Sequence, residues 1–204
     1  MDYKAETKKT YDSFPDSFEA KFDTYFHRHL QNEVNEFLKR IPVGGTILDL
    51  GSGAGNHALQ FLKRGYDVTC ADISEEMIKK CKEKGLKAVA MDFERLEFPP
   101  ASFDGVWAYT SLLHIPKSNL ESVLKGILNI MKEKGILFLG MKEGVDEGFR
   151  TQDKYPGTKR WFSLYTDSEL RKIVSPAFDI EFSSATKVDG DHTFLNYLLR
   201  GKPL

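Results

Sequence analysis

Residues 47–62 read ILDLGSGAGNHALQFL, and this stretch decides how the rest of the sequence is interpreted. A strand-like apolar run carries Asp49 near its end, glycines follow at Gly51, Gly53 and Gly55, and a helix-like stretch begins after them. Glycine adopts backbone torsions that side chains forbid, and it lets a ligand approach the main chain closely. One glycine would be enough for a turn, so the repeated glycines predict a ligand lying against this strand–loop–helix junction.

The composition is that of a globular protein with a sizeable core, because 41% of the 204 residues are hydrophobic and 29% are charged. The formal net charge of −1 disfavours nucleic acid and anionic lipid as partners. The amino-terminal sequence is too polar for a signal peptide, and the apolar run 136–139 is too short to cross a membrane. Cys70 and Cys81 have no metal-ligand or disulfide-framework spacing, so we expect reduced, structural thiols. These features predict a cytoplasmic enzyme or binding domain, either a monomer or a homodimer.

Strand-like and helix-like segments alternate along the chain. Short apolar strands are expected at 46–50, 67–71, 87–91, 103–109 and 136–141, and two more at 178–185 and 193–200. Helices are expected at 16–41, 56–64, 74–84, 118–132 and 167–174. Ser74 is a predicted N-cap, while Ser118 with Glu121 and Thr166 with Glu169 have the spacing of a capping box.

Strands separated by helices indicate a parallel sheet covered on both faces, because parallel crossovers need helices. The last two strands flank Asp189-Gly190, a hairpin-turn signal, and must therefore be antiparallel. We thus expect an α/β fold with a doubly wound, Rossmann-like sheet of seven strands, five of them parallel and two in a C-terminal antiparallel hairpin. In such sheets the ligand lies at the carboxyl ends of the strands.

The acid before the glycines argues against a dinucleotide as the ligand. The dinucleotide fingerprint is Gly-x-Gly-x-x-Gly, whereas residues 51–55 read Gly-x-Gly-x-Gly and follow Asp49. A nearby carboxylate repels a pyrophosphate at a helix N-terminus, so Asp49 suits a cationic group instead. Asp72 closes the second strand at the same edge of the sheet. It could accept hydrogen bonds from both ribose hydroxyls of an adenosine, or it could cap the helix that begins near Ser74.

Four motifs resemble those of class I S-adenosylmethionine (SAM)-dependent methyltransferases. ILDLGSGAG at 47–55 fits their first motif. Asp72 and Asp92 resemble the acids that close the second and third strands. FDGV at 103–106, followed by LLHI at 112–115, resembles the fourth-strand motif. The resemblance covers about residues 46–142 and is strongest to the small type 11 group. It implies transfer of a methyl group from SAM to a small-molecule acceptor by in-line displacement, with S-adenosylhomocysteine (SAH) as the product. Residues 1–45 would form an N-terminal helical cap, and residues 46–204 the SAM-binding methyltransferase domain with a lid at about 142–165.

The resemblance also implies roles for individual residues. Asp92 would accept a hydrogen bond from the adenine amino group, with the Phe93 amide on a ring nitrogen, although Asp92 could also be a solvated loop acid. Ile73 would pack on adenine, and Tyr11 would approach the carboxylate end of SAM or would only fix the N-terminal helix to the core. The predicted cofactor-binding residues are Tyr11, Asp49, Gly51, Ser52, Gly53, Gly55, Asp72, Ile73, Asp92, Phe93, Ala108, Tyr109 and Leu113.

The acceptor site is predicted from the segments that should lie over the strand ends. His114 follows the fourth strand near the expected methyl group, so it is the candidate general base, although a histidine at this place is frequently structural in the family. Residues 142–165 are long for a connection, and long connections often bind ligands. Arg150 and Arg160 could clamp an anionic substrate group or could be solvated surface arginines. The predicted substrate-binding residues are Lys142, Arg150, Arg160, Trp161 and Tyr165.

Other functions are weighed against methyl transfer. A non-catalytic module that binds SAM or SAH is open, because substrate residues vary widely in this fold. An NAD(P)-dependent oxidoreductase is disfavoured by the glycine spacing, and neither residues 3–12 nor the region around Tyr109 carries a catalytic Tyr-x-x-x-Lys pattern. Nucleic-acid methylation is disfavoured because residues 109–111 read Tyr-Thr-Ser where amino-methylating DNA enzymes carry Asp/Asn-Pro-Pro-Tyr. The sequence has no metal-ligand cluster, so a metal-dependent mechanism is not expected.

Overall fold

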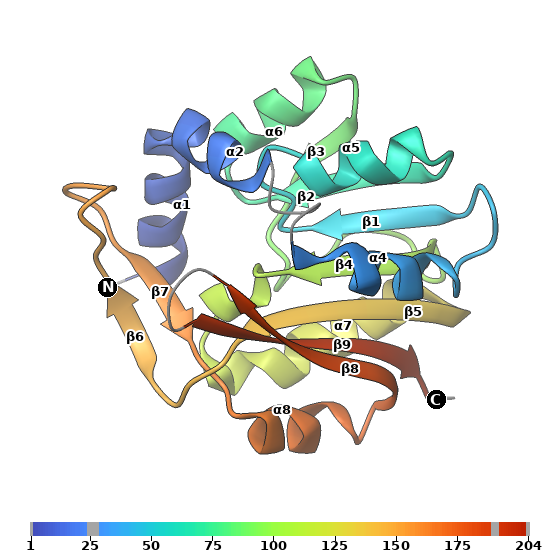
Figure 1. The fold of residues 1–204 in the computed structure, drawn as a ribbon. Helices are drawn as coiled ribbons and strands as arrows, with labels where there is room; N and C mark the ends of the chain where they lie inside the picture. Colours follow the sequence, from blue (N-terminus) through green and yellow to red (C-terminus); the bar gives the residue numbers. More distant parts are fainter. Residues whose placement is uncertain (1, 24–28, 189–191, 203–204) are drawn as a thin grey trace.

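A twisted sheet forms the centre of the molecule in the computed structural model, which describes residues 2–23, 29–188 and 192–202 (Figure 1). Its strands are β1 (Thr46–Leu50), β2 (Asp67–Asp72), β3 (Lys87–Ala90), β4 (Phe103–Tyr109), β5 (Met131–Lys142), β8 (Phe178–Val188) and β9 (His192–Gly201). Their order is β3-β2-β1-β4-β5-β9-β8, and the pairs among β1 to β5 are parallel. Strand β9 is antiparallel to both β5 and β8. The predicted fold class is therefore confirmed.

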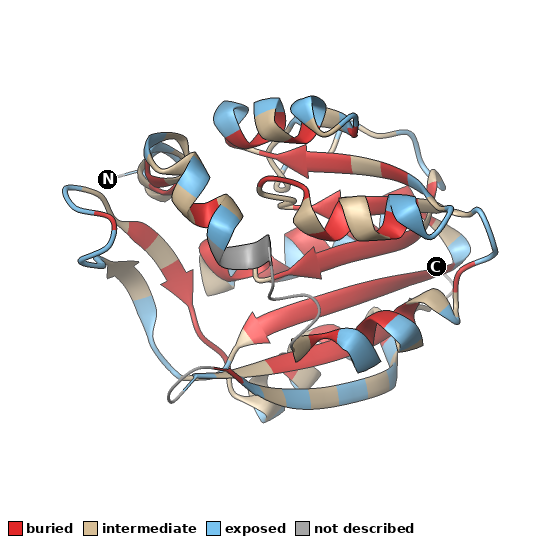
Figure 2. Cartoon of the chain, turned by 45° about the horizontal axis from the view of Figure 1, so that its top comes forward, coloured by how far each residue is buried: buried red, intermediate tan, exposed pale blue. Residues whose placement is uncertain are grey.

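Helices cover both faces of this sheet (Figure 1). They are α1 (Tyr3–Ser13), α2 (Pro15–Asp23), α4 (Gln31–Leu38), α5 (Asn56–Lys63), α6 (Glu75–Glu83), α7 (Leu120–Ile130) and α8 (Asp167–Val174). Alternate residues of each strand serve opposite faces, so Ile47 packs with α4 and α5 while Leu48 packs with α7 and α8. Figure 2 shows the result as buried strands between helices whose outer surfaces are exposed. Both faces of the sheet are thus used for the core.

Aromatic rings fill the core between the sheet and helices α4 and α5. Trp107 stacks on Phe138 with ring centroids 3.8 Å apart and planes 8° apart, and Phe37 and Phe61 meet Trp107 edge-on. The indole Nε1 of Trp107 donates to Nδ1 of His57 over 3.0 Å, so the polar atom of the buried indole is satisfied. This packing fixes strand β4, whose carboxyl end borders the site described below.

The predicted helix at 16–41 is wrong as a single element. Helix α2 begins at Pro15 and α4 begins after Leu30, whose backbone (φ −123°, ψ 12°) is not helical. The prediction rested on apolar residues that recur at helical spacing within 16–41. These residues belong to helices with different neighbours, because Phe18 packs against Tyr155 whereas Phe37 packs on the sheet. Periodicity alone cannot distinguish one long helix from two short ones with a common phase. Phe26, another of these regularly spaced apolar residues, lies outside the described residues.

The helix caps agree with the sequence at two places out of three. The hydroxyls of Ser74 and Thr166 accept from the amides of Met77 and Glu169, as N-caps do. The cap predicted at Ser118 is wrong, because a 3₁₀ turn, η2 (Lys117–Asn119), precedes α7 and the Ser118 hydroxyl donates to the Asn119 side chain instead. The turn predicted at Asp189-Gly190 lies outside the described residues.

Two elements had no sequence prediction of their own. Helix α1 is capped by Asp2, and a two-stranded antiparallel ribbon forms from β6 (Glu147–Arg150) and β7 (Arg160–Ser163). The ribbon stands beside α1 at one end of the sheet (Figure 1) and is tied to it by bonds from the Thr10 hydroxyl to the Lys159 carbonyl and from the Trp161 amide to the Thr7 hydroxyl. Within the described residues, no helix is long and apolar enough to span a membrane.

Replacing Phe138 by Ala should lower the free energy of unfolding by about 3–5 kcal/mol, because it removes the ring stacked on Trp107 and leaves a cavity in a tight core. Urea denaturation followed by circular dichroism measures the change. Val43→Ala is the control, since Val43 is fully exposed and its truncation should change stability by no more than about 0.5 kcal/mol. A loss at Phe138 no larger than at Val43 would show that the stacked pair is not a main support of the sheet.

Candidate active site

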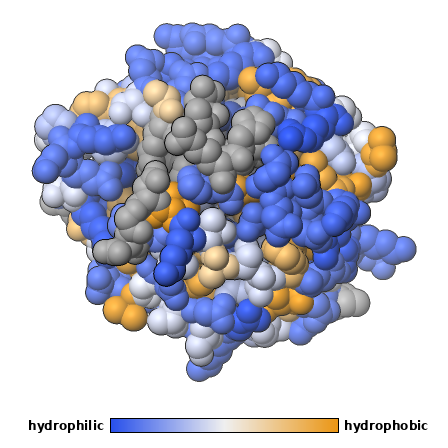
Figure 3. Space-filling model, in the orientation of Figure 1, coloured by the Kyte–Doolittle hydropathy of each residue, from blue (hydrophilic) through white to orange (hydrophobic). Residues whose placement is uncertain are grey.

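A cavity opens at the carboxyl ends of the parallel strands and is covered by α1 and α2. It holds about 940 Å³ of empty space including its open mouth, a size suited to a ligand of nucleotide dimensions. The described surface seen in Figure 3 is mainly hydrophilic, with scattered apolar side chains. The lining residues are Tyr3, Lys4, Thr7, Tyr11, Phe18, Glu19, Asp49, Gly51, Ser52, Gly53, Ala54, Asn56, His57, Asp72, Ile73, Met77, Asp92, Phe93, Tyr109, Thr110, Ser111, His114 and Ile115.

The glycine loop after β1 needs glycine for two different reasons. Gly51 has φ +72°, and a Cβ there would lie 2.2 Å from the Cβ of Ser111, so no side chain fits. Gly53 has φ +52°, and a Cβ there would meet nothing within 4 Å, so its bare backbone faces the open cavity. The amides of Gly51 and Ser52 both donate to the Ala71 carbonyl, which fixes the loop on β2. Gly55 faces Leu86 and Cys81 and serves packing rather than the cavity.

Two of the three predicted strand-end acids are buried in the cavity wall. Asp49 accepts from the Ala58 amide over 3.1 Å, and Asp72 accepts from the Gly53 amide over 2.8 Å and from the Ser74 amide over 2.9 Å. Burial raises the pKa of Asp49 to about 7. The hydrogen bond from Ala58 opposes this shift, and the nearby Asp72 adds to it. Burial also raises the pKa of Asp72. A cationic ligand would favour the charged form of both, so this wall is suited to positive charge.

Asp92 at the end of β3 has a partner that the sequence did not reveal. Lys4 of α1 places its ammonium 2.6 Å from a carboxylate oxygen of Asp92 and also pairs with Glu94. Burial acts to lower the pKa of Lys4, but its bonds to Asp92 and Glu94 outweigh that effect and raise it. Phe93 lines the cavity beside this pair. Helix α1 is thereby anchored over the end of β3.

His114 belongs to a hydrogen-bonded chain that crosses the cavity wall. Its Nδ1 lies 2.6 Å from the Trp161 carbonyl, which can only accept, so Nδ1 carries the proton and Nε2 accepts from the Tyr11 hydroxyl over 2.9 Å. The Tyr11 oxygen accepts in turn from Arg160 over 3.0 Å. Burial raises the pKa of Tyr11 although Arg160 opposes the shift, so the phenol keeps its proton and donates it. The structure thus joins Tyr11, His114 and Arg160, which are distant in sequence.

Arg160 is buried rather than solvated. Its guanidinium donates to Gln152 over 2.7 Å and to Tyr11, and it lies about 5 Å from the ring centroids of Tyr11, Phe18, Tyr155 and Phe162. Only 5% of Arg160 is exposed, which excludes the surface-arginine interpretation. The guanidinium instead links strand β7 to α1 and α2.

Several predicted site residues do not line the cavity among the described residues. Ala108 and Leu113 are buried in the core below it, and Tyr165 is fully buried beneath Lys117. Trp161 lies on the outer side of β7, where its Nε1 donates to Ser163 and its ring contacts Tyr3. Lys142, Arg150, Arg160 and Gly55 also lie outside the lining.

Apart from Tyr11, sequence reasoning did not name the lining residues contributed by α1, α2 and the turn after β4. Thr110 adopts φ +55°, which is uncommon outside glycine, and the Ser111 hydroxyl is buried without a hydrogen-bond partner in the described part of the chain. Asp2 followed by a helix-forming stretch was the available signal for α1, since its side chain accepts from the Lys4 and Ala5 amides. A strained turn and an orphan hydroxyl leave no signal in sequence.

Comparison with known proteins finds relatives that share part of this chain. Residues 47–135 match the family model of a methyltransferase domain. The ubiquinone/menaquinone biosynthesis C-methyltransferase UbiE of Rickettsia massiliae (strain Mtu5) is 32% identical over 134 residues, 56% of this chain and 53% of that protein. The S-adenosyl-L-methionine-dependent Diels-Alderase iccD of Talaromyces variabilis is 35% identical over 105 residues, 47% of this chain and 35% of that protein. The chain thus spans about half the length of the first relative and about a third of the second.

Solved structures agree with this on the level of the fold. Magnesium protoporphyrin IX methyltransferase (ChlM) from Synechocystis PCC 6803, solved with bound SAM, has a TM-score of 0.74 and 15% identity over 98% of both chains. The domain match, the sequence relatives and this fold together support a class I SAM-dependent methyltransferase.

Asp49→Asn should change how stability depends on pH. An unfolded Asp loses its proton near pH 4, whereas folded Asp49 keeps its proton up to about pH 7, so the wild type should lose stability as pH rises between these values. The amide of Asn has no charge to bury, so the variant should gain on the wild type across this window by up to about 4 kcal/mol. Urea denaturation at pH 4.5 and 7.5 measures the difference. Asp67→Asn, a change on the exposed end of β2, should keep the wild-type profile; an equal profile for Asp49→Asn would contradict the assignment.

Proposed function

We propose that the chain transfers a methyl group from SAM to a small-molecule acceptor and releases SAH. The observation that carries this proposal is the set of carboxylates of Asp49, Asp72 and Asp92, one from the end of each of three neighbouring parallel strands, around a cavity with bare backbone at Gly53. A sulfonium cofactor bears a net positive end and an adenosine end, and this wall offers buried acids to the first and hydroxyl acceptors to the second.

The lining residues fit the parts of SAM. Asp72 would take the ribose hydroxyls in exchange for part of its bonding to Gly53, and Ile73 with Phe93 would hold the adenine ring next to Asp92. Asp49 would face the methionine ammonium. The hydroxyl of Ser111, which is only 5% exposed and has no hydrogen-bond partner among the described residues, would gain one from the cofactor. The same family resemblance supports these roles.

Catalysis by this chain would rest on positioning and water exclusion. SAM supplies a methyl group activated by the positive charge of its sulfur. Tyr11, Phe18 and Tyr109 line the cavity, and α1 with α2 covers it, so the acceptor would meet the methyl in a largely apolar space. Holding two reacting atoms in line can supply about 7–11 kcal/mol. Little other chemistry is required when the acceptor atom is already a free nucleophile.

The chain of Arg160, Tyr11 and His114 would remove a proton from an acceptor that carries one. The acceptor proton would pass to the Tyr11 oxygen while the Tyr11 proton moves to Nε2 of His114, which becomes an imidazolium. Arg160 donates to the same Tyr11 oxygen and would stabilise the charge that develops there. The Trp161 carbonyl holds His114 in the tautomer that can accept.

His114→Gln should lower kcat by about 10²–10⁴-fold, the range for loss of a general base, and leave the affinity for SAH unchanged. Turnover of methyl-labelled SAM against a panel of small metabolites provides the assay. Tyr11→Phe is the matched variant and should give a similar loss of kcat, because it removes the relay between acceptor and His114. Full activity of both variants would remove proton transfer from the proposal and leave positioning alone.

A second candidate is a SAM-binding protein whose reaction transfers no methyl group, which the similarity to a SAM-dependent Diels-Alderase favours. Formation of SAH separates the two, since only methyl transfer consumes SAM. The cytoplasmic location and the monomeric or homodimeric state stay predictions from the sequence.

Isothermal titration calorimetry with SAM, SAH and NAD tests the cofactor. We expect micromolar binding of SAM and SAH and no binding of NAD, because two buried acids in the wall repel a pyrophosphate. Binding of NAD without SAM or SAH would overturn the proposed function.

Asp72→Ala should weaken SAH binding by about 1–3 kcal/mol, because the ribose hydroxyls would be left without an acceptor. Asp67→Ala is the matched control, since Asp67 starts the same strand at its exposed end and pairs only with Lys87 at the surface. Equal affinities of the two variants would place the ribose elsewhere.

A further inference from the structure

Three cationic side chains lie beside the cavity, and the described residues do not give each of them a carboxylate partner. Arg150 and Arg160 are direct cross-strand partners in the β6–β7 ribbon, so their side chains leave the same face. Like charges placed opposite each other destabilise a strand pair. Lys142, at the end of β5, adds a third cation: burial lowers its pKa, and Arg150 and Arg160 lower it further. The fold therefore keeps three cations near one another at a cost in stability.

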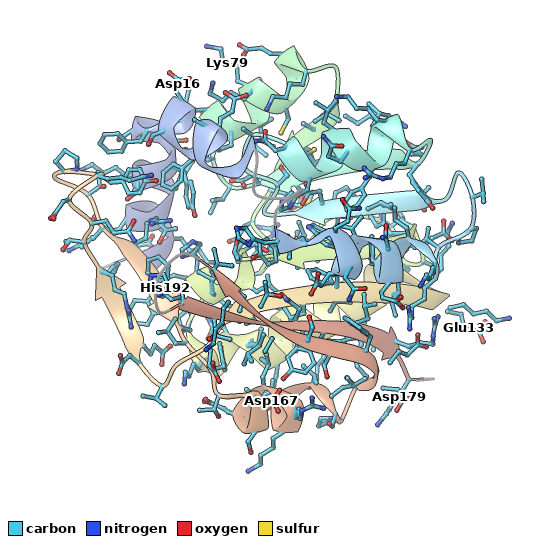
Figure 4. All side chains as sticks on the ribbon, viewed as in Figure 1. Asp16, Lys79, Glu133, Asp167, Asp179 and His192 are labelled. Atoms are coloured by element: carbon cyan, nitrogen blue, oxygen red, sulfur yellow. The ribbon has the colours of Figure 1, made fainter. Side chains whose placement is uncertain are left out.

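The described residues do not neutralise this group. No carboxylate lies within 4 Å of Lys142 or Arg160 in the part of the chain that the structure describes, and Arg150 reaches only Asp146, over 3.3 Å, at a side chain that is 74% exposed. The ammonium of Lys142 lies 3.4 Å from Nε2 of His192, which is not a carboxylate. Figure 4 shows His192 at the end of β9 on the side of the molecule where β7 and α1 lie. Lys142 and Arg150 thus have donors to offer a ligand.

The group borders the acceptor side of the cavity. Lys142 is the cross-strand partner of Phe194, whose ring centroid lies 5.8 Å from that of Tyr109 in the cavity wall. Arg160 bonds to Tyr11, and Tyr11 bonds to His114. Asp72 and Asp92, assigned to the adenosine, line the cavity from the ends of β2 and β3, whereas Lys142 ends β5 on the far side of β1 and β4. The cations therefore lie where an acceptor, rather than the cofactor, would be held.

We propose that Lys142 and Arg150 bind a carboxylate or phosphate group of the methyl acceptor, with Arg160 as a fixed positive charge behind them. Arg160 is buried and held by its bonds to Tyr11 and Gln152, so it contributes charge rather than a direct bond to this anion. The body of the acceptor packs on the rings of Tyr109 and Phe194. The identification of the bound anion as the methyl acceptor rests on the proposed function. The anion site itself is inferred from the three cations alone.

The experiment compares probes of one shape and different charge. Benzoate, phenyl phosphate and benzamide are titrated calorimetrically into the full chain, with and without saturating SAH. At least one of the two anions should bind about tenfold tighter than benzamide, the effect of one charge-assisted bond. A preference for phenyl phosphate assigns a phosphate and a preference for benzoate assigns a carboxylate. Equal affinities for all three probes would overturn the proposal.

Variants test the residues. Lys142→Met and Arg150→Gln should each reduce the preference for the anion about tenfold, and Lys142→Arg should retain it, which shows that charge rather than folding is measured. Lys125→Met, on the exposed face of α7, is the control and should change nothing. An undiminished preference in Lys142→Met would overturn the assignment.

The SAH titration separates this proposal from the proposed function. Failure of SAH to bind the wild type, with the anion preference intact and dependent on Lys142, would remove the methyltransferase proposal alone. SAH binding with no anion preference would remove the anion site alone.

Discussion

The buried carboxylate of Asp72 holds together the parts on which the site depends. One of its oxygens accepts from the Gly53 amide and the other from the Ser74 amide, so the end of β2, the glycine loop and the start of α6 share one acid. The Ser74 hydroxyl in turn donates to Asp12 of α1 over 2.6 Å, which brings the covering helix into the same network. A carboxylate bonded by backbone amides is a fixed acceptor, and a fixed acceptor is what recognition of a hydroxyl pair requires.

The parallel sheet explains why acids collect at one edge. Strands β1, β2 and β3 run in the same direction, so Asp49, Asp72 and Asp92 arrive at the same end of the sheet. Burying Asp49 and Asp72 disfavours their charged forms and raises their pKa values, and packing of the core does not require carboxyl groups at these positions. A penalty retained in a cavity wall points to a ligand that relieves it. The ammonium of Lys4 pairs with Asp92, which couples α1 to the end of β3.

The opposite side of the cavity carries the opposite charge. Arg160 lies within rings of α1, α2 and the segment before β7, and its bond to Tyr11 extends to His114. Lys142 and Arg150 lie near that guanidinium. The cavity therefore separates a wall of buried acids from a border of cations. Such a separation would orient both ligands. The positive sulfur of the cofactor would face the acids, and the proposed anionic acceptor would face the cations.

The strands and their directions, the glycine loop and the acids that end β1, β2 and β3 could be predicted from sequence, because period, turn chemistry and strand polarity are local properties. The break between α2 and α4, the 3₁₀ turn before α7 and the ribbon β6–β7 could not, because they depend on neighbours from elsewhere in the chain. The same holds for the bonds of Lys4 to Asp92 and of Arg160 to Tyr11. Sequence by itself determined the sheet and the edge at which the cavity opens. Only the tertiary structure decided which side chains close that edge, since residues about a hundred or more positions apart meet there by packing and not by pattern.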